Sequence, residues 1–434
     1  MEIIRYKDAD FAKKIESLAK RDAFPKEIVE PIKNILDDIK HHGNPAIIEY
    51  AKKFDGAQLD IANIRVSDAE INDAYNKIDT FTKDTVKTAI NNVTEFAKKQ
   101  LPKNWTFSPR HGVTLGEKFE PLRRIGAYIP GGTAPLVSTV IHTVAIAKAA
   151  GVKEIVAITP PGKDTCVTPE LLYAMKEAGA TEIYRLGGVY GIGAIAYGTE
   201  TINKVEKIVG PGNAYVTAAK KHVYGEVAID MIAGPSEIMV IADKSNNPDF
   251  IAADILSQAE HGSGHERAVL VTNSAKLIAQ VKTSIEQQAA KLSRTIPIQT
   301  VIANGIFLIE VENIEQAIEI ANNYAPEHLE IMCTDANVLA TKAKAAGAIF
   351  IGEYTPEPIG DFVAGPSHVL PTGGSARYFS GLTVSSFFRR ISLIKYNKQS
   401  LKKEMPAIEK FASMEGLDAH RNSALIRFNK YTKS

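Results

Sequence analysis

Apolar and polar positions along the chain follow two periods, and the change between them divides the sequence. Up to about residue 105 apolar residues recur at helical spacing, as at Val29, Ile32, Leu36 and Ile39. From about 119 to 240, and again from about 254, short apolar runs alternate with Ala-rich helical patterns. Strands that alternate with helices form βαβ units around a parallel sheet. The pattern therefore predicts an α/β protein with two such units after a helical N-terminal region.

Four segments are expected on this basis. They are a helical N-terminal region (1–105), two Rossmann-like, incomplete doubly wound α/β domains (106–240 and 241–374), and a small C-terminal tail (375–434). The tail contains one short helical pattern, PAIEKFASMEGL, which is too small to form a core of its own. We therefore expect the tail to dock on another surface.

Charge and cysteine content narrow the classes of partner and cofactor. The chain has 51 basic and 50 acidic residues, so its net charge does not favour binding to nucleic acid or to an anionic membrane surface. A small-molecule partner is therefore expected. The N-terminus lacks a secretory signal and no apolar run is long enough for a transmembrane helix, which predicts a cytoplasmic protein. Only Cys166 and Cys333 are present, so a metal would need His, Gln or carboxylate ligands.

The stretch SQAEHGSGHE contains two histidines four residues apart, His261 and His265. On a continuous helix they would share a face and could bind one metal ion. Gly262 and Gly264 oppose a continuous helix, so we expect it to end near His261. Gln258 lies one turn before His261 and becomes the better-placed neighbour. The sequence therefore favours a ligand at His261 over a His-x-x-x-His site.

Glycine-rich turns follow several apolar segments: IPGG at 129–132, GPGN at 210–213 and AGPS at 233–236. Such loops at strand ends either are tight turns or let backbone amides approach a nucleotide-like ligand. The segment GIGAIA, residues 191–196, matches a dinucleotide fingerprint in letters, but its context is poor and we assign its glycines to packing. AGPS recurs at 364–367, and we attach no function to the repeat.

Three stretches hold residues suited to acid–base or metal chemistry. In APEHLEI, Glu327 and His328 stand ahead of a strand and either perform general acid–base work or serve as a cap and a solvated imidazole. Asp361 lies in a Gly/Pro-framed loop, where it organises a turn or binds a divalent ion. In MEGLDAH, Glu415 and His420 come together on what is by default a solvated helix end.

Taken together, these stretches resemble the histidinol dehydrogenase family, a zinc- and NAD-dependent family that completes histidine biosynthesis. The family oxidises L-histidinol to L-histidinaldehyde and then to L-histidine with two NAD. The resemblance runs over nearly the whole length. Its motifs are HHGNPAIIEYAKKFDG, IGAYIPGGTAPLVSTV, IVGPGNAYVTAAK, DMIAGPSEI, DILSQAEHG, NNYAPEHLEI, IGDFVAGPSHVLPTGG and EGLDAHRNS.

The resemblance implies a role for each matching residue. The zinc ligands, one ion per subunit, would be Gln258, His261, Asp361 and His420, and the zinc would hold the imidazole and amine of the substrate. His328 would take the alcohol proton, and Glu327 would activate water for attack on the bound aldehyde. The NAD contacts implied are Tyr128 and Asn213. The substrate contacts implied are Ser236, Gln258, His261, His328, Asp361, Glu415 and His420.

The resemblance also implies a homodimer, in which the tail carries Glu415 and His420 into the site of the partner.

This chain differs from the family pattern at two places. The family usually has Gln where this chain has Tyr190, which bears on one NAD contact because a phenol cannot replace an amide. After His261 the segment GSGHER brings in His265 and Arg267 in place of an acidic or proline-containing loop. Neither departure touches the metal ligands.

Two alternatives to a histidinol dehydrogenase activity stay open from the sequence. The chain could oxidise another small alcohol with NAD, which Tyr190 allows, but Glu415 and His420 suit a substrate with an imidazole and an amine. It could also be a catalytically silent relative that only binds a ligand. The intact pair of Glu327 and His328 disfavours that alternative.

Overall fold

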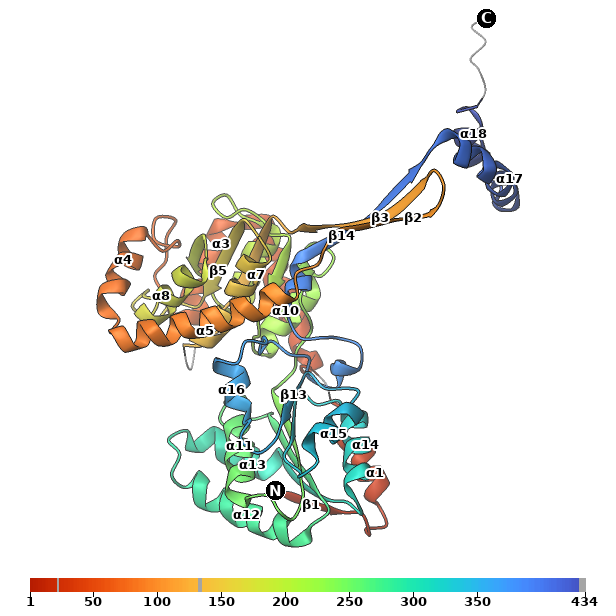
Figure 1. Cartoon of the computed structure of the whole chain (residues 1–434). Coiled ribbons are helices and arrows are strands. Elements are labelled where there is room, and N and C mark those ends of the chain that lie inside the picture. The colour runs from red at the N-terminus through yellow and green to blue at the C-terminus, as the bar shows by residue number, and fades with distance from the viewer. Residues whose placement is uncertain (22, 132–134, 429–434) are drawn as a thin grey trace, which may run out of the picture. The chain divides into compact units, whose positions relative to one another are not determined.

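The computed structural model describes residues 1–21, 23–131 and 135–428 and divides the chain into two compact units. The large unit contains Met1–Gln100 and Leu122–Phe387, and the small unit contains Leu101–Pro121 and Phe388–Ser434. The domain boundaries expected from the sequence stay predictions. The expected α/β class is confirmed, because both sheets of the large unit are parallel and carry helices (Figure 1).

One sheet of the large unit has six strands in the order β1-β11-β10-β9-β12-β13. The strands are β1 (Glu2–Arg5), β9 (Glu237–Ala242), β10 (Arg267–Thr272), β11 (Ile306–Glu310), β12 (His328–Ile331) and β13 (Ala348–Ile351). Four of them, β10 to β13, lie on apolar runs that predicted strands. The N-terminal region, expected to be helical, instead begins with β1, whose Glu2 pairs with Phe307 of β11.

Helices cover both faces of this sheet, and every residue of β9 is buried (Figure 1). Ile238 and Val240 face one core and Met239 and Ile241 face the other, because successive side chains of a strand point to opposite sides. The helices of the first core are α11 (Pro248–Ala259), α12 (Ala275–Ala289) and α13 (Thr295–Asn304). Those of the second are α1 (Phe11–Leu18), α14 (Ile314–Tyr324) and α15 (Ala336–Lys342).

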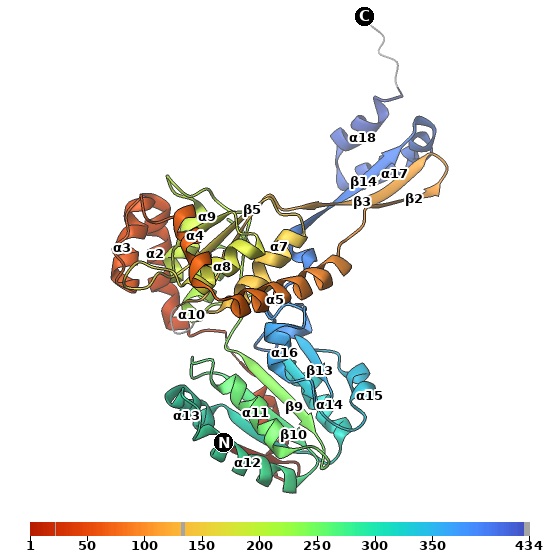
Figure 2. The ribbon, with the colours of Figure 1, turned by 60° about the vertical axis from the view of Figure 1, so that its left-hand side comes forward.

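The other sheet of the large unit has the order β6-β5-β4-β7-β8. Its strands are β4 (Arg124–Tyr128), β5 (Glu154–Thr159), β6 (Glu182–Arg185), β7 (Lys207–Val209) and β8 (Ala228–Ile229). Helices α2 (Val29–His42), α3 (Asn44–Asp55), α9 (Gly188–Tyr197) and α10 (Ala214–Val223) share one core with it. The other helices of this region are α4 (Asp68–Lys77), α5 (Thr80–Lys99), α6 (Val137–Val140), α7 (Ile146–Ala149) and α8 (Pro169–Ala178) (Figure 2).

The segment GIGAIA lies wholly inside α9, so it does not form the loop of a dinucleotide fingerprint. A Cβ atom at Gly193 would lie 2.9 Å from Cδ1 of Ile39 on α2. Glycine at this position lets two helices approach closely, which confirms the packing role expected for it.

The small unit combines a three-stranded antiparallel sheet with two helices. They are β2 (Trp105–Arg110), β3 (Val113–Pro121), β14 (Phe388–Tyr396), α17 (Lys398–Glu415) and α18 (Asp418–Leu425). Arg110 pairs with Glu404 of α17 at 2.6 Å, and Ser400 Oγ donates to the carbonyl of His111. The unit exposes several large apolar side chains: Trp105, Phe107, Ile391, Leu393, Ile394, Phe411, Met414 and Leu417. So much exposed apolar surface suggests an interaction surface.

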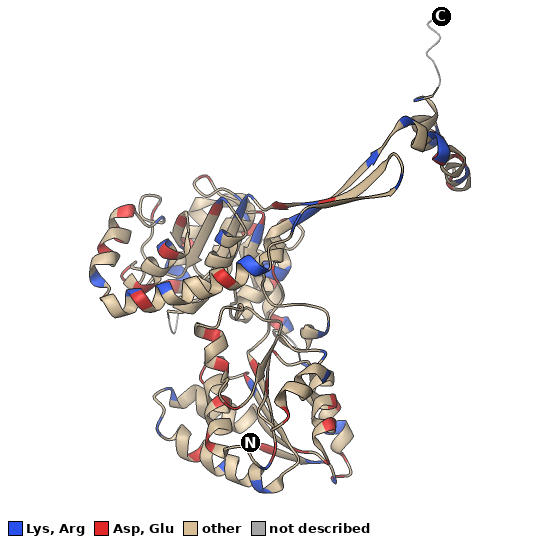
Figure 3. Cartoon of the chain, viewed as in Figure 1, with Lys and Arg blue, Asp and Glu red and all other residues tan. Residues whose placement is uncertain are grey.

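Basic and acidic residues are interspersed along both units, as Figure 3 shows. Their numbers are nearly equal, which gives the net charge of +1. Among the described residues no helix has the length and apolar character needed to cross a membrane. The cytoplasmic location stays a prediction.

Candidate functional site

Glu327 and His328 lie at the amino end of the six-stranded sheet. His328 is the first residue of β12, and the neighbouring strand β9 begins at Glu237. In open α/β sheets ligands usually bind outside the carboxyl ends of the strands. Glu327 and His328 therefore lie at the amino ends of the strands, opposite to the carboxyl ends where ligands usually bind in such sheets. α14 ends three residues before Glu327, and Ala325 takes a left-handed conformation with φ of 53°, which turns the chain sharply into β12.

The backbone of Glu237 holds both side chains of the pair. Its N–H donates to Oε2 of Glu327 at 2.8 Å, and its carbonyl lies 3.0 Å from Nδ1 of His328. Because a carbonyl only accepts, Nδ1 of His328 carries a proton, and Nε2 is the basic nitrogen of the neutral ring. The side chain of Glu237 is itself buried and pairs with Arg21 at 2.9 Å, which fixes the start of β9.

Burial and mutual charge shift the pKa of every group in this cluster. Burial raises the pKa of Glu327 to about 8, and the opposing effect of His328 is smaller. Burial also disfavours a charge on His328, but Glu327 and Asp361 outweigh it and raise its pKa to about 10. Although burial acts to raise it, the pKa of Asp361 is held below its usual range by His328 and His368. Carboxyl and imidazole groups shifted in this way are typical of catalytic sites.

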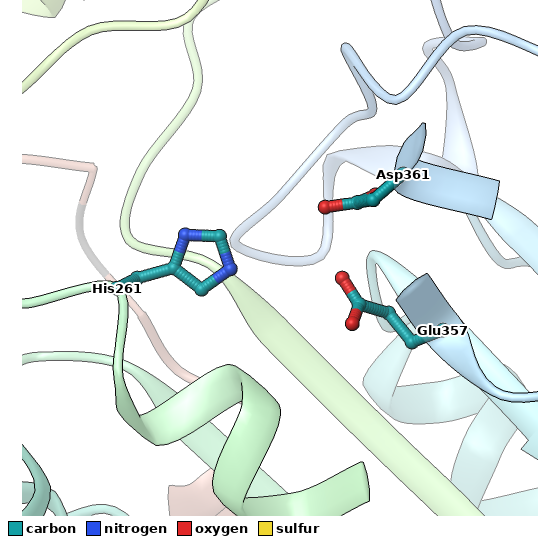
Figure 4. Close-up of side chains that lie close together, drawn as sticks. All are labelled: His261, Glu357 and Asp361. Atoms are coloured by element: carbon teal, nitrogen blue, oxygen red, sulfur yellow. The ribbon is translucent and has the colours of Figure 1, made fainter. Parts of the chain in front are cut away.

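Asp361 stands beside this pair and beside His261. Oδ1 of Asp361 lies 3.5 Å from Nε2 of His328. Figure 4 shows His261, Glu357 and Asp361 pointing toward one another, and one donor atom of each lies within 4.8 Å of the others. His261 is exposed and Glu357 is buried, so solvent reaches the group from the side of His261. Within the described residues, His261, Glu357 and Asp361 therefore form a group of side chains that could hold a metal ion.

The helix before His261 ends as predicted, with α11 stopping at Ala259. Gln258, in its last turn, is fully buried, yet neither polar atom of its side chain has a hydrogen-bond partner among the described residues. Leaving a buried amide without a partner costs about 1–3 kcal/mol, so such an atom points to a missing ligand. His265 is exposed and lies outside the metal-capable group. The geometry therefore gives no support to the His-x-x-x-His site.

These residues fit a zinc ion by their chemistry. Zinc binds imidazole nitrogen and carboxylate or amide oxygen at about 2.0–2.2 Å. His261 and Asp361 supply donors of these kinds, and the buried amide of Gln258 is left free to do so. The assignment of all four zinc ligands stays a prediction, because His420 belongs to the small unit.

Glu357 was not predicted as a site residue from the sequence. Asp361 was expected in a loop, but it lies on the short helix α16 (Glu357–Phe362), and that expectation was wrong. On a helix, residues four positions apart share a face, so Glu357 and Asp361 present neighbouring carboxylates. The spacing in EPIGDF was the available signal, and the flanking prolines and glycine hid it by suggesting a loop.

His368 and His142 extend the cluster behind Asp361. Nδ1 of His368 lies 3.2 Å from the carbonyl of Asp361, and its ring stacks on that of His142 at 4.5 Å between centroids. Burial, and then His368, lower the pKa of His142 to about 3, so this ring is neutral. The two rings fix the backbone that carries Asp361.

The residues expected to contact NAD lie at the carboxyl ends of the five-stranded sheet. Tyr128 ends β4, and its hydroxyl accepts from the N–H of Gly188 at the start of α9. Asn213 follows β7 and caps α10, with Oδ1 accepting from the N–H of Val216 at 3.1 Å. Helix N-termini favour the phosphates of a dinucleotide. This placement suits a cofactor, although Gly132 of the IPGG turn lies outside the described residues.

Tyr190 is almost fully buried within α9, and its hydroxyl donates a hydrogen bond to Asp55. Burial, and then Asp55, raise the pKa of this phenol well above its ordinary value. Its hydroxyl therefore already has a protein partner, and its expected contact with NAD stays a prediction.

The remaining expected site residues are Ser236, Glu415 and His420. Ser236 directly precedes β9 and the backbone of Glu237, which holds Glu327 and His328. Glu415 ends α17 and His420 lies on α18, and both are exposed in the small unit. They line a hollow there together with Tyr396, Phe411 and Leu417. Their roles toward substrate and zinc stay predictions.

Comparisons with known proteins identify the family of this chain. The family model described as histidinol dehydrogenase matches residues 18–428. A histidinol dehydrogenase of Heliobacterium mobile is 45% identical over 92% of this chain and 93% of its own length. That of Clostridium acetobutylicum is 44% identical over 98% of each. The crystal structure of histidinol dehydrogenase from Elizabethkingia anophelis has a TM-score of 0.92 at 36% identity and covers 99% of this chain and 98% of that chain.

Proposed function

The chain belongs to the histidinol dehydrogenase family and is an oxidoreductase of histidine biosynthesis, and on this premise we propose how its site works. It oxidises L-histidinol to L-histidine through L-histidinaldehyde, with two NAD and one zinc ion per subunit. The observation that carries the proposal is the pair of Glu327 and His328, held by one backbone residue beside a group that can bind metal.

His328 acts as the base in alcohol oxidation. Its Nδ1 proton is held by the carbonyl of Glu237, so Nε2 is the atom that takes the hydroxyl proton as hydride leaves for NAD. A neutral imidazole is required for this step, and a cation held by Asp361 would favour it by offsetting one of the two carboxylates that raise the pKa of His328. The base is supported on one side by β9 and on the other by Asp361, so its ring cannot rotate away.

Glu327 acts in the second oxidation. It takes a proton from water as the water adds to the carbonyl carbon of the aldehyde, and the hydrate then loses hydride to a second NAD. Burial raises the pKa of Glu327 to about 8, so its carboxylate is a stronger base than an exposed one. The N–H of Glu237 fixes Oε2, which leaves the other oxygen for the water.

Zinc, when bound, supplies a template that holds the imidazole and amine of the substrate. Gln258, His261 and Asp361 of one chain would hold it together with His420. NAD would lie against Tyr128 and Asn213. The starts of α9 and α10 lie beside these two residues and offer backbone N–H groups that suit its pyrophosphate.

We further propose a homodimer in which the small unit of one chain completes the site of the other. The exposed apolar residues of the small unit and the hollow around Glu415 and His420 support this, because apolar surface of this extent needs a partner. Glu415 would bind the amine of the substrate, for which a carboxylate is suited.

A stoichiometric assay tests the proposed activity. Two NADH should form for each L-histidinol consumed, and a chelator should abolish turnover until zinc is restored. NADH formed only with other small alcohols would favour the alternative substrate. If the protein binds L-histidinol without producing NADH, it is a silent relative.

Replacing Tyr190 with Phe tests its structural role against a role in cofactor binding. The change leaves the half-buried carboxylate of Asp55 without its partner, so the free energy of unfolding should fall by about 1–3 kcal/mol in urea denaturation. The KM for NAD should change less than about tenfold. As a control, the double variant with Asp55→Asn removes the unpaired charge and should recover part of the lost stability. A larger change in KM with unaltered stability would contradict this view.

A further inference from the structure

Arg21 follows helix α1 and buries its guanidinium between two backbone segments of the candidate site. Its Nε lies 2.9 Å from Oε1 of Glu237, and Nη2 donates to the carbonyl of Tyr324 at 2.6 Å. The side chains of Arg21 and Glu237 are each 4% exposed. A buried guanidinium with two such partners ties the two segments together.

The first segment is the start of β9. The N–H of Glu237 donates to Glu327, and its carbonyl accepts from Nδ1 of His328, so a shift of this one residue moves the partners of both side chains. The side chain of Glu237 is anchored by Arg21. Arg21 therefore acts on Glu327 and His328 through a single intermediate residue.

The second segment is the turn from α14 into β12. The helix ends at Tyr324, where the last carbonyls have no partner within the helix, and Arg21 supplies a donor for one of them. Cζ of Arg21 also lies 3.5 Å from the centre of the Tyr324 ring. Glu327 comes only three residues later. The guanidinium thus fixes both the segment that carries Glu327 and the residue that binds it.

Charge gives an independent reason for a cation at this point. Burial raises the pKa of Glu237 to about 7, and Arg21 is the strongest of the groups that oppose this effect. A carboxylate that stays buried after its cation is removed is strongly unfavourable, so the start of β9 would have to rearrange. Only an arginine can satisfy the carboxylate and the carbonyl with fixed, planar donors and also stack on the ring.

We propose that Arg21 is a positioning residue for both oxidation steps, because it joins the start of β9 to the end of α14 and so holds Glu327 and His328 in place. The inference rests on the proposed function, since it concerns the same two side chains. Glu237 and Tyr324, which Arg21 contacts, are not among the residues expected to bind zinc or NAD. Loss of Arg21 should therefore lower the rates of reaction and leave the binding of substrate and metal intact.

Single-turnover measurements on full-length Arg21→Met test this role. Both hydride transfers, started from L-histidinol and from L-histidinaldehyde, should slow by about 10–100-fold, because a displacement of about 1 Å can cost that much. The KM for L-histidinol and the Zn²⁺ content should stay near the wild-type values. Circular dichroism verifies that the variant is folded under the conditions of the assay.

Arg267 provides a matched control for stability. Its guanidinium also donates to a backbone carbonyl, that of Leu18 at 2.9 Å, and also lies near an aromatic ring, that of Phe307. Leu18 ends α1 and Phe307 belongs to β11, so neither is part of the two segments that Arg21 joins. Arg267→Met should lower the midpoint of urea unfolding, as Arg21→Met does, and keep both rates.

A double variant separates positioning from simple charge compensation, and it serves where Arg21→Met does not fold. Combining Arg21→Met with Glu237→Gln removes the unpaired charge and keeps the backbone N–H and C=O that hold Glu327 and His328. This protein should fold. Both of its rates should stay low, because the bond from residue 21 to the carbonyl of Tyr324 is lost.

Wild-type rates in folded Arg21→Met, or in the double variant, would overturn the positioning role and leave the proposed function standing. An equal loss of rate in Arg267→Met would do the same, since loss of stability alone would then explain the effect. A wild-type protein that forms no NADH from L-histidinol would overturn both.

Discussion

Replacing Glu327 with Gln is expected to slow oxidation of L-histidinaldehyde by about 10²–10⁴-fold, the usual contribution of a general base. The amide still accepts the hydrogen bond from the N–H of Glu237 but cannot take a proton from water. The first hydride transfer from L-histidinol, for which we propose His328 as the base, should change by less than about tenfold. Single-turnover measurements of each step, started from the alcohol and from the aldehyde, give the two rates.

A buried glutamate three residues further along β12 provides the control. Glu330 is as buried as Glu327 and also accepts a backbone N–H, that of Glu357, at 2.7 Å. Glu330→Gln should leave the ratio of the two rates unchanged, whatever its effect on overall activity. Equal losses in both steps of Glu327→Gln would contradict the assignment of Glu327 to water activation.

Mixing two inactive variants should restore activity if the site is shared between chains. His261→Asn removes a donor of the large unit, and His420→Asn removes one of the small unit. When the two proteins are unfolded, mixed in equal amounts and refolded, half of the dimers contain one chain of each. Every such dimer has one site with both defects and one with neither, so activity should return to about a quarter of the wild-type value.

The matched control mixes His261→Asn with Asp361→Asn. Both residues belong to the large unit, so every site in a mixed dimer keeps one defect, and activity should stay absent. Native mass spectrometry verifies that mixed dimers are present in both experiments. If they are present and the first mixture stays inactive, His420 does not complete the site of the partner.

The sequence by itself predicted the features that local periodicity and local glycines control. The apolar runs at β5, β6, β7 and β10 to β13 lie where strands form, because a strand buried on both faces is apolar at nearly every position, and that pattern is a property of the segment itself. The helix α11 ends at Ala259 because Gly262 and Gly264 take φ values of 101° and 76°, which no helix continues through. Glu327 and His328 could be proposed together because they are adjacent in the chain, and their catalytic roles stay a prediction.

Tertiary structure alone decided which distant segments meet, since such contacts depend on the packing of the whole chain. The pairing of β1 with β11 and the bond between Tyr190 and Asp55 leave no mark on local periodicity. Glu237 holds Glu327 and His328 through its N–H and C=O, groups that almost every residue possesses, so no sequence pattern singles it out. The approach of Glu357 to His261 likewise follows from the docking of α16 beside the end of α11, which no local signal encodes.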